Sequence, residues 1–259
     1  MSNTEWSRVT TSVTVFEIVE AIDELNGAEL TELTNELELA KSTIHRHLST
    51  LVDLEYVVKQ GNEYYLGHKF VKLSNHVRKR KDPALKLAEP KVKQVAEQTG
   101  ERTQFMVEEH GKVAYTFLEM GSDNAVATGV EEGRRIPINV SSSGKAILAE
   151  LPDERVHEIL DNNDLVAWTE NTIVSKEKLF EELEQIRERG YALNWEESMK
   201  GLRTIAVPVA PKERGVIGAL SISGPAHRFT GEKFTEELPN LLLGVANELE
   251  LDIEYSDEV

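Results

Sequence analysis

No cysteine occurs among the 259 residues of the sequence. This absence excludes disulfides, zinc sites built on thiolates and cysteine nucleophiles. The sequence also has no run of about 18 apolar residues, the usual minimum for a membrane-spanning helix. Its first ten residues, MSNTEWSRVT, lack the basic and apolar regions of a signal peptide. We therefore expect a cytoplasmic protein, whose length suits two modest domains.

Basic residues are also scarce, since 29 Lys and Arg against 46 Asp and Glu give a formal net charge of −17. A DNA-binding surface needs Lys and Arg for phosphates, so this total argues at first against nucleic acid. The excess is uneven, however: residues 1–81 carry a net −2 and residues 82–259 a net −15. The windows 39–52 and 64–81 contain no acidic residue and are candidate contacts with a polyanion. The acidic remainder is typical of proteins that stay soluble in salt-rich cytoplasm, and it favours a halophilic source.

Three helices and a β-hairpin are predicted in the N-terminal part. The first spans about 11–27 and ends at a glycine, and its apolar face is formed by Val13, Phe16, Ile18, Val19 and Ile22. The second is short, and its apolar face is formed by Leu30, Leu33 and Leu37. The third carries a stripe formed by Ile44, Leu48 and Leu51. The hairpin YVVKQGNEYYLG, turning at Gly61-Asn62, completes a winged helix-turn-helix.

The face of the third helix opposite this stripe offers hydroxyls, an imidazole and cations, and no carboxylate. Such groups bind phosphates and base edges in the major groove. A solvated face of a helical bundle would instead mix both signs of charge, as residues 177–189 do. The candidate DNA-contacting residues are Lys41, Ser42, Thr43, His45, Arg46 and Ser49. A metal at His45 and His47 is disfavoured because residues two apart point to different sides of a helix.

The C-terminal part predicts an antiparallel sheet flanked by helices, an α+β fold. A basic linker helix over 69–82 ends at Asp82-Pro83 and divides a DNA-binding domain, 1–68, from an effector-binding domain, 83–259. A helix with Pro90 as a kink or restart comes first, followed by a hairpin turning at His110-Gly111. The other expected strands are 125–130, 191–195, 203–211 and 215–223. The other expected helices are 143–151, 153–161, 176–189 and 232–252.

The stretch SSSGKA, residues 141–146, permits several chemical interpretations. A phosphate-binding loop would require glycine at 139 and a hydroxyl at 146, where Asn139 and Ala146 stand. Ser142 and Lys145 form the S-x-x-K of serine acyl-transfer enzymes, but Ser122-Asp123-Asn124 precedes it in the wrong order and no K-T-G follows. A non-catalytic interpretation is a helix N-terminus whose free amides bind an oxyanion, with Lys145 facing solvent.

Longer stretches carry a family resemblance. LTELTNELELAKSTIHRHLSTLVDLEYV, GRRIPINVSSSGKAILAELP, RERGYALNWEESMKGLRTIAVPV and ALSISGPAHRF, in this order, resemble transcriptional regulators of the isocitrate-lyase-regulator (IclR) type along nearly the whole chain. The resemblance implies a winged helix-turn-helix, a linker helix and a GAF-like effector domain, assembled as a dimer or a dimer of dimers. It implies no catalysis, no cofactor and no metal. The partners it implies are a double-stranded DNA operator and a small organic or sugar-derived acid.

The resemblance also transfers effector contacts onto this chain. These are Ser142, Ser143, Gly144, Asn194, Thr204, Ser221 and Ser223. Asn194 stands where the family usually has aspartate, and Thr204 where it usually has cysteine. Replacing a carboxylate by an amide removes repulsion toward an anionic ligand and adds a donor, so we expect altered ligand chemistry.

The leading hypothesis is a homo-oligomeric, effector-modulated transcriptional regulator, controlling catabolic genes. A metabolite-binding enzyme of the serine acyl-transfer type with an appended helix-turn-helix is the alternative. It would require a nucleophile, a base and an oxyanion donor that converge. A third hypothesis, an architectural DNA-associated protein without a ligand, is weakened by the effector motifs.

Overall fold

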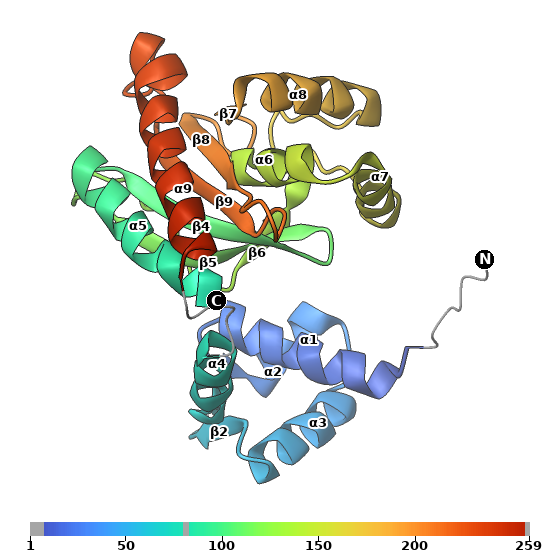
Figure 1. Cartoon of the computed structure of the whole chain (residues 1–259). Helices are drawn as coiled ribbons and strands as arrows, with labels where there is room; N and C mark the ends of the chain where they lie inside the picture. Colours follow the sequence, from blue (N-terminus) through green and yellow to red (C-terminus); the bar gives the residue numbers. More distant parts are fainter. Residues whose placement is uncertain (1–7, 80–82, 257–259) are drawn as a thin grey trace. The chain divides into compact units, whose positions relative to one another are not determined.

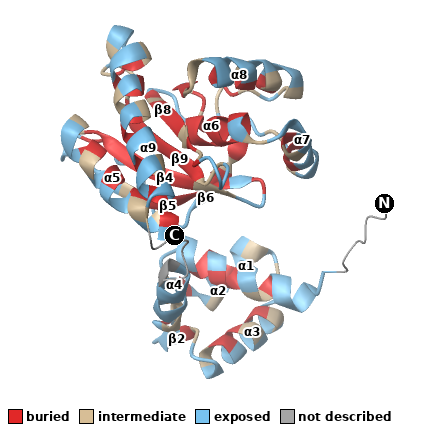
Figure 2. Cartoon of the chain, in the orientation of Figure 1, coloured by how far each residue is buried: buried red, intermediate tan, exposed pale blue. Residues whose placement is uncertain are grey.

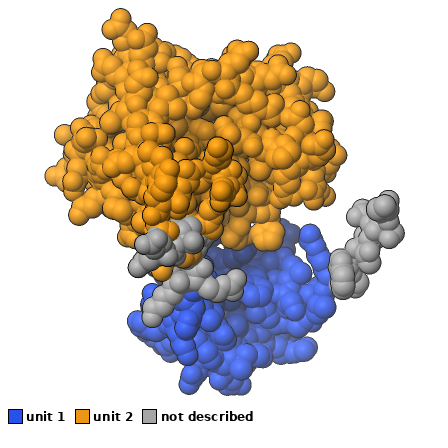
Figure 3. All heavy atoms as spheres, in the orientation of Figure 1, with its two compact units in different colours: residues 1–81 blue, residues 82–259 orange. Residues whose placement is uncertain are grey.

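The computed structural model of the chain describes residues 8–79 and 83–256, and the chain divides into two compact units, residues 1–81 and 82–259 (Figure 3). The end of the expected linker helix, residues 80–82, and most of the N-terminal segment considered as a signal peptide lie outside the described residues. Within the described residues, no helix is long and apolar enough to span a bilayer.

The first unit contains the helices and hairpin that the sequence predicts. Its helices are α1 (Thr10–Glu24), α2 (Leu30–Leu37), α3 (Lys41–Asp53) and α4 (Lys69–Lys79) (Figure 1). Strands β2 (Val57–Gln60) and β3 (Glu63–Leu66) pair antiparallel around Gly61, whose φ of 62° suits a glycine in a tight hairpin turn. A two-residue strand, β1 (Ala28–Glu29), adds to β3 and was not expected.

The core of the first unit confirms the predicted stripe of α3, because Ile44 and Leu48 are fully buried and Leu51 nearly so. The predicted face of α1 is partly wrong. Ile18, Val19 and Ile22 are buried, but Val13 is 38% exposed and Phe16 is 62% exposed. The buried face of α1 begins at Thr14, four residues before Ile18, and this one-residue shift rotates it about 100° away from Val13. Phe16 therefore lies on the outer side of the helix.

The second unit is built on a six-stranded antiparallel sheet in the order β6-β5-β4-β9-β8-β7. The strands are β4 (Arg102–Glu109), β5 (Lys112–Met120), β6 (Arg135–Pro137), β7 (Ala192–Trp195), β8 (Leu202–Val209) and β9 (Gly218–Pro225). The hairpin of β4 and β5 turns at His110 and Gly111, as predicted, and both residues have positive φ. The fold is α+β, as expected.

Helices cover both faces of this sheet (Figures 1 and 2). Helices α5 (Pro83–Thr99) and α9 (Leu238–Glu254) pack side by side on one face, over a core that contains Phe105, Ile205 and Leu220. Helices α6 (Ser142–Glu150), α7 (Asp153–Asn162) and α8 (Lys176–Arg189) contribute to the core on the other face, which contains Met106 and Ala206. Side chains alternate between the faces along each strand, so polar residues two apart on β4 reach the same side.

The second unit differs from the expected elements in three places. Residues 125–130 form no strand, because β5 pairs instead with the short β6 that the sequence did not reveal. Helix α5 continues through Pro90, so of the two alternatives expected there, a kink or a restart, the restart is wrong. The start of the last expected helix, 232–252, is a π-helical turn, Lys233–Glu237, and the α-helix begins only at Leu238. The irregular segment 125–130 supplies Thr128 and Val130 to the pocket described below.

Candidate DNA-binding face and effector pocket

The outer face of α3 presents the predicted DNA-contacting residues to solvent. Lys41, Ser42, His45, Arg46 and Ser49 are exposed, and Thr43 is half-buried. The hydroxyl of Ser49 donates to the carbonyl oxygen of His45 at 2.9 Å, so its oxygen remains able to accept. Within the described part of the chain, neither Lys41 nor Arg46 forms an ion pair. Both cations are therefore free to contact an external anion.

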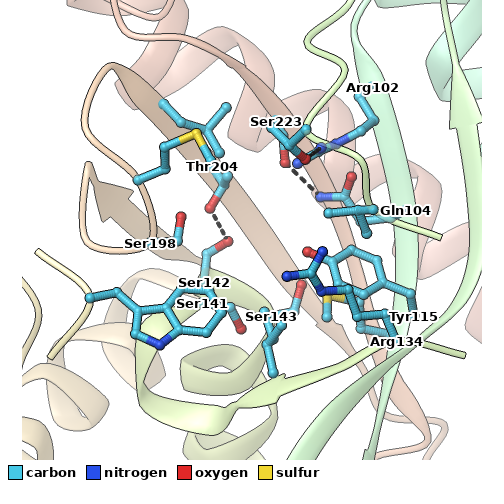
Figure 4. Close-up of a pocket in the computed structure, with 17 residues that line it drawn as sticks. Arg102, Gln104, Tyr115, Arg134, Ser141, Ser142, Ser143, Ser198, Thr204 and Ser223 are labelled. Carbon is cyan, nitrogen blue, oxygen red and sulfur yellow. Dashed lines mark hydrogen bonds between the residues drawn. The ribbon is translucent and has the colours of Figure 1, made fainter. Parts of the chain in front are cut away.

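A pocket in the second unit lies between the first turn of α6 and the sheet (Figure 4). Its cavity volume is about 80 Å³. The polar residues that line it are Arg102, Gln104, Tyr115, Thr128, Arg134, Ser141, Ser142, Ser143, Ser198, Thr204 and Ser223. The apolar residues that line it are Met106, Val130, Ile136, Trp168, Met199 and Leu202. Among residues 8–79 and 83–256, no aspartate or glutamate lines the pocket.

Helix α6 begins at this pocket with its positive dipole end. The Ser141 side chain accepts a hydrogen bond from the Gly144 amide at 2.9 Å and so caps the helix. The amides of Ser142 and Ser143 precede the first intrahelical bond and are the remaining donors of the first turn. A helix N-terminus with free amides favours a bound anion.

Hydrogen bonds tie the pocket hydroxyls to the sheet. The hydroxyls of Ser142 and Thr204 lie 2.6 Å apart, and Ser143 donates to Ser221 at 2.9 Å. Gln104 Nε2 donates to the hydroxyls of Ser221 and Ser223, both at 2.8 Å. Gln104 Oε1 is buried and accepts no hydrogen bond from the described part of the chain. These bonds join α6, β8, β9 and β4 around one cavity.

The structure places the residues carried over from the resemblance in two groups. Ser142, Ser143, Thr204 and Ser223 line the pocket. Ser221 does not line it, but its hydroxyl supports Ser143 and Gln104.

The other two residues, Gly144 and Asn194, also lie outside the lining. A Cβ on Gly144 would come within 1.9 Å of the Ile138 carbonyl oxygen, so the glycine permits a close approach of α6 to the preceding turn. Asn194 is fully buried. Its amide donates to the carbonyl oxygen of Val140 at 2.8 Å and accepts from the amide of Glu197 at 2.9 Å.

The expectation that Lys145 faces solvent is wrong. Its side chain is 1% exposed, and Nζ lies 2.7 and 2.9 Å from the two carboxylate oxygens of Glu197. Nζ also donates to the carbonyl oxygen of Leu193 at 2.8 Å. Burial raises the pKa of Glu197, and the attraction of the Lys145 ammonium partly offsets this rise. The partner that allows this burial lies 52 residues away in the sequence, so spacing alone could not reveal it.

Sequence reasoning missed the cationic side of the pocket, formed by Arg102 and Arg134 together with Tyr115. Arg102, Thr103 and Gln104 are three consecutive polar residues at the start of β4, so the sequence offers no alternation that would single out Arg102. Burial lowers the pKa of Arg102. Burial also raises the pKa of Tyr115, while the nearby charges of Arg102 and Arg134 lower it.

Comparison with known proteins covers both units. The family model for the C-terminal region of the bacterial transcriptional regulator IclR matches residues 80–251, and that for the IclR helix-turn-helix domain matches residues 15–61. A probable helix-turn-helix regulator, ArcR, of Halobacterium salinarum is 32% identical over 98% of this chain and 97% of its own length. The transcriptional repressor IclR of Escherichia coli is 33% identical over 85% of this chain and 81% of its own. The crystal structure of Thermotoga maritima IclR superposes with a TM-score of 0.77 at 26% identity, over 96% of this chain and all of that one.

Proposed function

Because the chain belongs to the IclR family of transcriptional regulators, we propose that α3 binds a DNA operator and that a small acid in the pocket of the second unit changes this binding. The observation that carries the DNA assignment is the exposed face of α3, which combines hydroxyls, an imidazole and two unpaired cations with no carboxylate. In a chain of net charge −17, such a face is a marked exception.

The proposed contacts divide by chemistry. Lys41 and Arg46 neutralise phosphates or read guanine, and Ser42, Thr43, His45 and Ser49 contact phosphates and base edges. The wing of β2 and β3 adds a backbone contact, because Lys59 on β2 is exposed. Helix α3 enters the major groove as the recognition helix of a helix-turn-helix.

The proposed assembly is a homodimer or a dimer of dimers on a palindromic operator. Two recognition helices must lie about one helical turn of DNA apart, or a multiple of it, to contact both half-sites. Effector binding shifts the population between arrangements of the DNA-binding units that fit the operator and arrangements that do not. The size of this shift is limited by the differential affinity of the effector for the two arrangements.

The proposed effector is an organic acid or a sugar-derived acid. The first-turn amides of α6, with the hydroxyls of Ser142, Ser143 and Thr204, form a set of donors suited to a carboxylate. The pocket lining contains no acidic side chain that would repel such a ligand. The chain is proposed to act on chromosomal DNA in the cytoplasm, and its acid-rich second unit suits a salt-rich interior.

The geometry does not favour catalysis by Ser142. An S-x-x-K serine needs a lysine base, but Lys145 Nζ is bound to Glu197 and to the Leu193 carbonyl. The Ser142 hydroxyl bonds instead to the Thr204 hydroxyl, which is not a base at neutral pH. We therefore propose that the chain acts by binding alone.

Replacement of Arg46 by alanine tests the DNA assignment. An operator is first enriched from a random double-stranded library with the wild-type chain, and affinities are then measured by mobility shift at fixed salt. Loss of an arginine contact to a base or phosphate should weaken binding by about 5- to 150-fold, since one good contact contributes ~1–3 kcal/mol. The matched control is Arg155→Ala, a half-buried arginine on α7 in the other unit. Equal affinities for the Arg46 variant and the wild type would contradict α3 as the recognition helix.

A further inference from the structure

The charge of the effector pocket is opposite to that of the chain around it. Acidic residues outnumber basic ones by 46 to 29 in the sequence, yet two arginines and no carboxylate line this pocket. Neither Arg102 nor Arg134 forms an ion pair with a carboxylate of the described residues. The pocket therefore holds a net positive charge that the protein itself does not neutralise.

Arg102 is the more informative of the two, because it is only 3% exposed. Its Nη1 bonds to the Thr128 hydroxyl and, at 3.4 Å, to the Val126 carbonyl, while its Nε has no hydrogen-bond partner among the residues that the structure describes. The preceding residue, Glu101, does not compensate it, since both Glu101 oxygens are bound to Arg228 at 2.9 and 2.6 Å. A buried guanidinium without a counter-ion is unfavourable unless a ligand supplies the charge.

Arg134 adds a second cation at the same side of the pocket. It is exposed, and its contact to the Gly129 carbonyl oxygen is long, 3.5 Å. Figure 4 shows its guanidinium extending beside the Tyr115 ring toward the cavity, on the same side as Arg102 and Gln104. Its charge acts on Tyr115 together with that of Arg102. The two guanidinium groups thus bring two positive charges to the lining of one cavity.

The first turn of α6 is a second and chemically different site for an anion. Its donors are the amides of Ser142 and Ser143, and in Figure 4 these serines and Thr204 lie across the cavity from Arg102. A carboxylate bound by these amides leaves Arg102, on the opposite side of the cavity in Figure 4, without an anion. A ligand with an acidic group at each end supplies an anion to both.

The size of the cavity limits the length of such a ligand. A volume of about 80 Å³ corresponds to roughly five to eight water-sized groups, taking ~10–15 Å³ for each. A four-carbon dicarboxylate, with eight non-hydrogen atoms, is at the upper end of this range. A hydroxyl on its chain could donate to Gln104 Oε1, which is buried and unpartnered.

We propose that the effector is a short-chain dicarboxylate, with one carboxylate at the first turn of α6 and the other bound by Arg102 and Arg134. This inference rests on the proposed effector function and adds the charge and length of the ligand. Arg102 would then determine specificity for diacids over monoacids of equal length. The serines alone do not distinguish diacids from monoacids, because they bind the carboxylate that both kinds of acid have.

The test is calorimetric titration of the full chain with succinate, malate and butyrate at constant ionic strength. The wild type should bind succinate and malate at least about tenfold more tightly than butyrate, because a charge-assisted contact to a second carboxylate exists only for the diacids. Arg102→Gln should remove most of this preference and leave butyrate binding within about twofold. Arg134→Gln should act in the same direction and more weakly, since this side chain is exposed. Arg155→Gln is the control outside the pocket.

The variants also separate specificity from folding. Arg134 is exposed and its replacement should leave the unfolding temperature unchanged, so it tests the inference even if the Arg102 variant folds poorly. Butyrate binding as tightly as succinate to the wild type, or equal weakening of both acids by the two arginine variants, would overturn the dicarboxylate assignment. A diacid that binds through the arginines but leaves operator affinity unchanged would contradict the proposed function and leave this inference intact. If none of the three acids bound, the dicarboxylate assignment would be wrong.

Discussion

The buried ion pair of Lys145 and Glu197 allows a quantitative prediction about the stability of the second unit. Replacing Lys145 by methionine keeps much of the side-chain volume and removes the ammonium that lies 2.7 Å from Glu197. The Glu197 carboxylate is then buried without its cation. Breaking a buried pair by removing one partner typically costs about 3–5 kcal/mol. For a unit of this size, such a loss lowers the unfolding temperature by roughly 6–20 °C.

The stability lost in Lys145→Met should depend on pH, and the direction of this dependence follows from the ionisation of Glu197. Burial already raises the pKa of Glu197 above 4.5, and removal of Lys145 raises this pKa further. In the variant, protonated Glu197 stabilises the folded state fully at pH values below 4.5. That stabilisation is lost as the pH rises through the raised pKa. The difference between the wild type and Lys145→Met should therefore be smaller near pH 4.5 than near pH 7.5.

Thermal unfolding followed by tryptophan fluorescence measures this difference, since Trp168 and Trp195 lie in the second unit. Lys176→Met is the control, because Lys176 forms an exposed pair with Asp161 that should contribute at most about 1 kcal/mol. The double variant Lys145→Met with Glu197→Leu should recover much of the lost stability, as an apolar replacement leaves no buried charge. If Lys145→Met lost no more stability than Lys176→Met, the reasoning about the buried pair would be refuted.

Two further predictions concern packing. Leu48→Ala, at a fully buried position of α3, should destabilise the first unit by about 2–5 kcal/mol and lower operator affinity. Its control is Leu54→Ala, which should have little effect because Leu54 is 52% exposed. Equal urea midpoints for the two variants would contradict the assigned core. Gly144→Ala should displace the first turn of α6, because its Cβ would lie 1.9 Å from the Ile138 oxygen, and should weaken acid binding measured by calorimetry. Gly244→Ala in α9 is its control, since that Cβ meets nothing within 4 Å, and indistinguishable acid binding by the two glycine variants would argue against the close approach at Gly144.

The sequence was most informative where structure depends on local periodicity. The stripe of α3 and the turns at Gly61 and Gly111 follow from side-chain spacing and from backbone angles that glycine permits. The strand expected at 125–130 fails for a related reason. Its alternation of small apolar residues meets the local rule, but the neighbouring strand pairs with Arg135–Pro137 instead. Side-chain alternation within a segment does not determine which of two segments pairs with the free edge of a strand.

Only part of the pocket could be predicted, because contacts between residues distant in the sequence do not follow from local patterns. The serines before Gly144 indicate a helix N-terminus, so the sequence alone predicts that they could bind an anion there. Arg102 joins them because it pairs with Ser223 across the β4 and β9 strands, 121 positions apart in the chain. Lys145 was expected at the surface because an isolated ammonium prefers water. Glu197, the partner that allows this ammonium to be buried, is distant from Lys145 in the sequence. Only the tertiary structure could therefore reveal the pair.

The hydrogen bonds among the pocket hydroxyls have a thermodynamic consequence. Ser142 with Thr204, and Gln104 with Ser221 and Ser223, are already held in one geometry before any ligand arrives. Ordering a free side chain on binding costs about 0.5–1.5 kcal/mol. A ligand entering this pocket has to immobilise chiefly Arg134, Trp168 and Met199, which line the pocket and are exposed. Most of its interaction energy therefore remains available to distinguish one arrangement of the regulator from another.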